Sequence, residues 1–165
     1  MTDAAEPAAR APDLAEPIIG YRQWRLQDAT LWSPYLDFAW RRGVNTARCE
    51  LDKGHPDPAP AHECVCGLHA WYRPSPRLGS AVPDLVAGAV ALWGEVEVHA
   101  TGLRAQYAAV IALVLPLAHT TKRRRVAELA DSLEVDLVPT RQLQACALGY
   151  GQPLSSDWLA ATLPG

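Results

Sequence analysis

The sequence predicts an α+β domain: a small curved antiparallel sheet or partial barrel with a Cys/His-rich loop, followed by two short C-terminal helices. Apolar residues recur at every second position over residues 85–99, which is the period of a β-strand. After Pro116 they recur with the helical period instead. Upstream of both segments, residues 48–71 contain three of the four cysteines and three of the five histidines. Such a cluster is typical of a loop held by a metal ion.

The composition is that of a globular protein with no strong preference for polyanions. The 165 residues are 49% hydrophobic and 20% charged, with a net charge of −3, so any nucleic-acid contact requires a local basic patch. The first residues include two acids and lack the apolar core of a signal peptide. The longest apolar run, 107–117, is shorter than the roughly 20 residues that span a bilayer. We therefore expect a cytoplasmic protein without a membrane partner, in which clustered cysteines are metal ligands rather than disulfides.

Four segments are predicted along the chain. They are a disordered tail (1–17), a β-rich domain (18–118) with a metal-binding loop (48–71), a helical appendage (119–150) and a C-terminal tail (151–165). The N-terminal segment is rich in Ala, Pro and acids and shows no periodicity, which is the reason for predicting a tail.

The β-rich segment contains one clear hairpin. Its first strand, residues 85–99, turns at 100–102 and returns antiparallel from Leu103. Gly88 and Gly94 interrupt the strand and indicate a bulge, a sharp bend or the close approach of another backbone. Shorter strands are expected at residues 18–26, 31–32 and 43–51.

The C-terminal part predicts two short helices. Thr121 can cap the first and Pro139 begins the second, which Gly149 can end. Cys146 lies on the apolar side of the second helix and is expected in the core. The apolar stripe of the first helix comprises Val126, Leu129, Ala130 and Leu133.

The Cys/His-rich loop predicts a structural zinc site. Three cysteines and one histidine would supply the four tetrahedral ligands of such a site. His55 is the preferred histidine because it lies inside the closed loop, with His62 and His69 as alternatives. Gly67 would allow a positive φ and direct backbone N–H groups at thiolate sulfur. The alternative is that the cysteines are reduced and packed as small hydrophobic residues. The predicted ligands are Cys49, His55, Cys64 and Cys66.

Five motifs span roughly residues 20–110. They are Gly20-Tyr21-Arg22 with Trp24, Ala47-x-Cys49, Cys64-x-Cys66-Gly67-Leu68-His69-Ala70, Val90-Ala91-Leu92-Trp93-Gly94-x-Val96 with His99, and Gly102-Leu103-Arg104-Ala105. Together they resemble an uncharacterised bacterial protein family that is common in actinobacteria. The resemblance implies that the Cys-x-Cys-Gly element and the Leu-Trp-Gly strand belong to one module. It implies no reaction, because the family has no settled activity.

The predicted role is a non-enzymatic interaction or regulatory module that binds a protein partner. The chain has six tryptophans, which is more than one small core easily buries. Trp32, Trp40 and Trp71 lie near loops, where exposed aromatic side chains anchor partners. The alternative is that these rings fill the core around the metal loop.

One alternative role is a DNA-binding regulator with a helix-turn-helix in residues 125–149. A basic run would contact phosphates beside it. Against this role, Glu134 occupies the turn position that favours glycine, and Pro139 would fall inside the recognition helix. The basic run consists of Lys122, Arg123, Arg124 and Arg125.

A second alternative is a small-molecule enzyme with a site centred on His99 and Arg104. Together with Glu95 and Glu97, they could perform acid–base chemistry near the hairpin turn. No nucleophile motif or phosphate-binding loop accompanies them. Charge pairs across a sheet are also common without catalysis.

Overall fold

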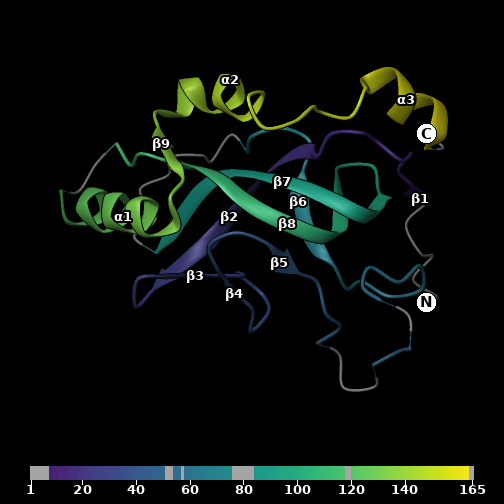
Figure 1. Cartoon of the computed structure of the whole chain (residues 1–165), viewed down its shortest axis with the longest axis horizontal. Coiled ribbons are helices and arrows are strands. Elements are labelled where there is room, and N and C mark those ends of the chain that lie inside the picture. The colour runs from purple at the N-terminus through teal and green to yellow at the C-terminus, as the bar shows by residue number, and fades with distance from the viewer. Residues whose placement is uncertain (1–7, 51–53, 57, 76–83, 118–119, 164–165) are drawn as a thin grey trace, which may run out of the picture.

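Strands that are distant in the sequence pair into one mostly antiparallel sheet (Figure 1). The computed structural model describes residues 8–50, 54–56, 58–75, 84–117 and 120–163. The strands are β1 (Ala9–Arg10), β2 (Ile18–Gln27), β3 (Thr30–Trp32), β4 (Ala39–Trp40), β5 (Asn45–Thr46), β6 (Leu68–Trp71), β7 (Leu85–Val98), β8 (Gly102–Val114) and β9 (Asp136–Val138). The helices are α1 (Thr120–Leu133), the 3-10 turn η1 (Thr140–Gln142), α2 (Leu143–Ala147) and α3 (Ser156–Thr162).

Four strands of the sheet pair in a closed ring. β2 pairs with β7 and β6, and β8 pairs with the same two strands. The β2–β6 contact consists of the single pair Tyr21 and Trp71, so the ring is not a regular barrel. The predicted α+β class with a curved antiparallel sheet is thereby confirmed, and β7 and β8 form the predicted hairpin.

The two strand glycines produce the predicted irregularities. Gly94 has a φ of 80° and lies where the β7–β8 register shifts between Trp93 and Val96. At Gly88, an added Cβ would lie 2.2 Å from the carbonyl oxygen of Ala112, so only glycine allows the two backbones to approach. A bulge and a close approach therefore accompany the curvature of the long hairpin.

The core lies on both faces of the sheet because β2, β7 and β8 bury side chains on each side. On one face, Trp24 and Trp40 pack with the predicted stripe of α1, of which Val126, Leu129 and Ala130 are buried. On the other, Ile19 and Tyr21 belong to a cluster that includes residues of α2. Figure 1 shows α1 and α2 at different sides of the β7–β8 hairpin.

The C-terminal region differs from its prediction in two ways. A third helix, α3, lies within the segment expected to be a tail and is capped by Ser155, whose hydroxyl accepts from the N–H of Trp158. β9 runs between α1 and α2 and pairs parallel with β8. Since a helix-turn-helix joins its helices by a short turn, the predicted motif is wrong for this segment.

The N-terminal region also contains a strand where a tail was expected. Ala9 and Arg10 form β1 and pair with β7.

No helix in the described part of the chain combines the length and the apolar character that a membrane crossing requires.

Candidate metal centre

The predicted metal ligands converge because β5 and β6 both pair with the same strand. Thr46 of β5 lies opposite Tyr107 of β8, and Leu68 of β6 lies opposite Ala105. The chain therefore leaves the sheet after β5 and re-enters it at β6 at points that are only two residues apart along β8. The buried side chain of Asn45 fixes the start of this connection by accepting from the N–H of Arg41 at 2.8 Å. The intervening loop has to fold back on itself, which brings its ends together.

Three thiols and one imidazole meet where the loop closes. Their ligand atoms all lie within 4.8 Å of one another, so the group could hold a metal ion. The Sγ atoms of Cys49 and Cys64 are 3.8 Å apart, and His55 Nε2 is 3.2 Å from Cys66 Sγ. Around zinc with Zn–S bonds of about 2.3 Å, tetrahedral angles place two sulfurs about 3.8 Å apart. The spacing of the first pair is therefore that of a tetrahedral site, and it is far too long for a disulfide.

The two thiols of the Cys-x-Cys turn have pKa values that are shifted in opposite directions. Burial raises the pKa of the Cys64 thiol, but hydrogen bonds from the backbone N–H of Cys66 and from neighbouring side chains outweigh it and lower the pKa to about 7. Burial raises the pKa of the Cys66 thiol to about 11, and the nearby Cys64 contributes to the increase. Gly67 has the predicted positive φ, at 127°. An ion bound here would favour the ionised form of every thiol.

The structure also separates the three candidate histidines. His62 Nδ1 lies 3.0 Å from a carboxylate oxygen of Glu97, away from the thiols. His69 Nε2 donates to the carbonyl oxygen of Val65 at 2.8 Å. His55 alone of the three belongs to the cluster in the described residues.

Arg104 lies behind the loop and contacts it through its guanidinium group. It donates to the carbonyl oxygens of Cys66 at 3.0 Å and Ala61 at 3.2 Å. The same group pairs with Glu97, and its Nε donates to His99 Nε2 at 3.2 Å. Arg104 is only 3% exposed. The predicted pair of His99 and Arg104 is therefore in contact, but most N–H groups of Arg104 are engaged with the protein itself.

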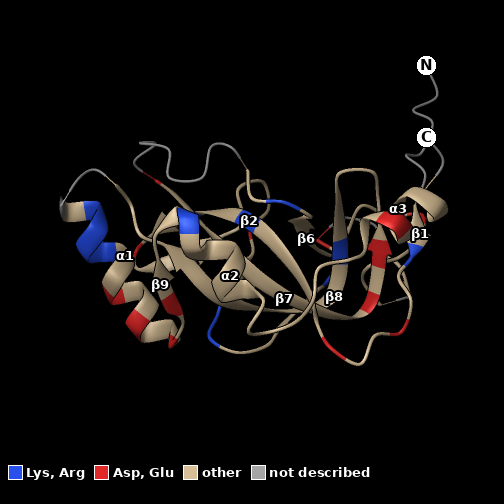
Figure 2. Ribbon diagram, turned by 90° about the horizontal axis from the view of Figure 1, so that it is seen from above, with Lys and Arg blue, Asp and Glu red and all other residues tan. Residues whose placement is uncertain are grey.

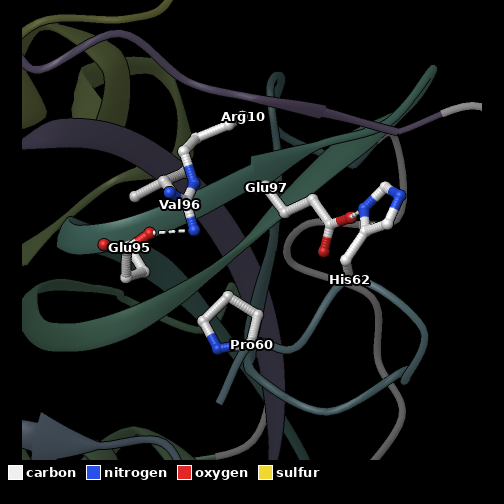
Figure 3. Close-up of a pocket in the computed structure, with 6 residues that line it drawn as sticks. All are labelled: Arg10, Pro60, His62, Glu95, Val96 and Glu97. Atoms are coloured by element: carbon white, nitrogen blue, oxygen red, sulfur yellow. Dashed lines mark hydrogen bonds and ion pairs between the residues drawn. The ribbon is translucent and has the colours of Figure 1, made fainter. Parts of the chain in front are cut away.

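A small pocket is lined in part by Glu97, and neither His99 nor Arg104 is among its lining residues; Figure 3 shows the residues that do line it. Its volume is about 170 Å³, which is below the roughly 300 Å³ of typical ligand sites. Both of its carboxylates are already paired, Glu95 with Arg10 and Glu97 with His62. The pocket is lined by Arg10, Pro60, His62, Glu95, Val96 and Glu97.

The three predicted tryptophan contacts lie in different environments. Trp40 is 2% exposed and its indole N–H donates to Ser33 Oγ, so the prediction of a surface anchor is wrong for this residue. Its ring packs edge-on against Trp24 within the buried core cluster, so it contributes to the core instead. Trp32 is half-buried. Trp71 is 42% exposed at the end of β6 and remains available to a partner.

The basic run forms the first turns of α1, with acidic residues toward the end of the helix (Figure 2). Lys122 is buried, and burial lowers its pKa. The other three cations, residues 123–125, are exposed, and Arg124 lies 3.9 Å from Glu128. This arrangement is that of a solvated helix surface.

Comparisons with protein-family models, curated proteins and solved structures give no match for this chain. A function therefore has to be argued from the site itself.

Sequence reasoning missed Arg22, a second buried arginine. Its guanidinium lies 4.3 Å from the centre of the Trp40 ring and donates to the carbonyl oxygen of His69 at 2.8 Å. Burial lowers its pKa to about 9. In β2, Arg22 lies two positions before the buried Trp24 and therefore on the same face of the strand. This position was the signal that Arg22 points inward.

Proposed function

We propose that this chain is a non-enzymatic interaction module whose fold is completed by one structural zinc ion. The observation that carries the proposal is the convergence of three thiols and one imidazole within 4.8 Å. Thiolate ligands favour zinc over hard cations such as Mg²⁺ and Ca²⁺, which prefer oxygen. The four ligands are Cys49, His55, Cys64 and Cys66.

A structural role fits this ligand set better than a catalytic one. Catalytic zinc sites use three protein ligands and keep a fourth position for water or substrate, whereas structural sites close all four positions. Here four protein side chains are available to the ion. The ion would join Cys49, which follows β5, to the Cys-x-Cys turn that precedes β6. Its effect would be to hold the loop and the start of β6 against β8.

The surface next to the centre supports the binding of a protein partner. His69 and Trp71 point outward on β6 in alternation with the buried Leu68 and Ala70. Val65, between the two ligands of the turn, is 71% exposed. Exposed tryptophan beside aliphatic surface is typical of interface anchors. We place this module in the cytoplasm, where a reducing environment keeps the four cysteines as free thiols.

Metal analysis of untagged protein tests the proposal. Elemental analysis is expected to find one zinc per chain in the wild type and in Cys146→Ser, since Cys146 lies outside the cluster. Cys49→Ser and Cys64→Ser are expected to lose the ion. Protein that folds without any bound metal, and whose thiols all react freely, would contradict the proposal.

A further inference from the structure

We infer that Arg104 is the positioning residue of the metal centre: it holds the Cys-x-Cys turn in its ligating geometry, so its contacts govern metal affinity. The inference rests on the zinc site proposed above and adds a residue that is not a ligand. Groups that orient metal ligands through hydrogen bonds commonly change affinity by about 10–100-fold when they are replaced.

Both cysteines of the turn are tied to Arg104 through the backbone. One guanidinium nitrogen donates to the carbonyl oxygen of Cys66 at 3.0 Å. The other donates at 3.2 Å to the carbonyl oxygen of Ala61, which also accepts from the N–H of Cys64 at 3.0 Å. A shift of the guanidinium would therefore move the backbone of one ligand residue directly and that of the other through a shared carbonyl.

The side chain of Arg104 is itself fixed from behind. Glu97 lies directly across the β7–β8 ladder and pairs with it in a buried position. The other oxygen of Glu97 lies 3.0 Å from Nδ1 of His62, a further residue of the loop (Figure 3). Gly67 packs on the aliphatic stem, since an added Cβ would lie 3.0 Å from Arg104 Cβ. A buried group that is held on several sides can impose its geometry on the loop.

The charge of Arg104 also suits the loaded centre. Three thiolates around a divalent cation carry a net charge of −1. A guanidinium behind the turn would offset this charge. Lysine would retain the charge but not the planar fork that reaches two carbonyl groups at once.

The test compares Arg104→Lys with Arg22→Lys. Arg22 is a matched control: it is buried at 8% exposure and donates to a β6 carbonyl, that of His69. Within the described part of the chain, no hydrogen bond or ion pair joins it to Cys49, His55, Cys64 or Cys66. Zinc affinity is measured by competition with a chromophoric chelator, and stability of the metal-free proteins by urea unfolding. We expect Arg104→Lys to weaken zinc binding about 10–100-fold and Arg22→Lys to leave it within about threefold, although both lose stability.

Cobalt substitution supplies a readout that stability alone does not move. The visible spectrum of bound Co²⁺ reports tetrahedral thiolate geometry, and it is expected to change in Arg104→Lys but not in Arg22→Lys. If Arg104→Lys does not fold, Glu97→Gln serves instead, because it removes the ion pair that anchors Arg104 and is expected to weaken zinc binding in the same direction.

The outcomes separate this inference from the proposed function. Wild-type protein that binds no zinc would overturn both. Zinc binding with equal affinities and unchanged cobalt spectra in the Arg104 and Glu97 variants would overturn only the role of Arg104. Equal losses of affinity in the Arg104 and Arg22 variants would do the same, because they would trace to general destabilisation.

Discussion

Replacing Gly67 with alanine is expected to destabilise the protein through two separable effects. The φ of 127° at this position is readily accessible only to glycine, and strain of this kind costs about 1–3 kcal/mol. The new methyl group would also lie 3.0 Å from Arg104 Cβ and 3.1 Å from Pro60 Cβ. Neither atom can rotate away, and overpacking of this kind costs a further 1–3 kcal/mol or so. The total expected loss is about 2–6 kcal/mol of the free energy of unfolding.

Gly43→Ala is the reference variant for the first effect, backbone strain, so that its difference from Gly67→Ala measures the second. Gly43 has a φ of 75°, but an added Cβ would meet nothing within 4 Å, so this variant suffers backbone strain alone. Urea unfolding of the zinc-loaded proteins should therefore show Gly67→Ala to be less stable than Gly43→Ala by about 1–3 kcal/mol. Gly67→Ala should also bind zinc more weakly, because the displaced turn carries two ligands. Equal stability and equal zinc affinity in the two variants would refute the reasoning.

Three further predictions concern the metal and the surface. Chelation should lower the melting temperature of the wild type and of Cys146→Ser by about 5–11 °C, because zinc at 100 times its Kd adds about 2.7 kcal/mol to the free energy of unfolding. Cys49→Ser, which lacks a ligand, should melt at the same temperature with and without chelator. In chelated protein at pH 8, mass spectrometry should show Cys64 as the fastest thiol to alkylate, at a pKa of about 7. Cys66 and Cys146 should both react slowly, because burial raises the pKa of each thiol to about 11. Trp71→Ala should leave the melting temperature nearly unchanged but weaken retention of a protein partner, and unchanged retention would remove Trp71 from the interface.

The long hairpin and α1 were predictable because local pattern and tertiary burial agree there. The stripe of α1 specifies one buried face, and the period of two in β7 places its larger side chains on one face of the sheet and its alanines on the other. The second half of β8 is different: residues 108–114 are almost entirely apolar and buried on both faces, so they show no alternation. Short strands such as β6 and β9 form because they pair with β8. Such long-range pairing cannot be deduced from the β-propensity of a short segment.

The metal centre could be predicted only as a set of residue types. Spacing identified three cysteines, and the position of His55 inside the loop favoured it over its rivals. The sequence did show that Arg104 can share a sheet face with an acid, and Glu97 fills that place. It could not show that the guanidinium turns toward the carbonyl oxygens of Cys66 and Ala61, because that contact depends on the folded path of the loop.

The position of the loop within the sheet explains what a bound metal would contribute here. β6 is held by four residue pairs to β8 but by a single pair to β2, so it is the weakest member of the ring. Its first residue, Leu68, directly follows the Cys-x-Cys-Gly turn. A loop of this length has many open conformations, and hydrogen bonds of so short a strand offset little of the entropy lost in ordering it. A metal that joins the turn to Cys49, together with the contacts of Arg104 on the other side, would fix the start of β6. It would thereby hold the exposed Trp71, at the end of this strand, in one orientation.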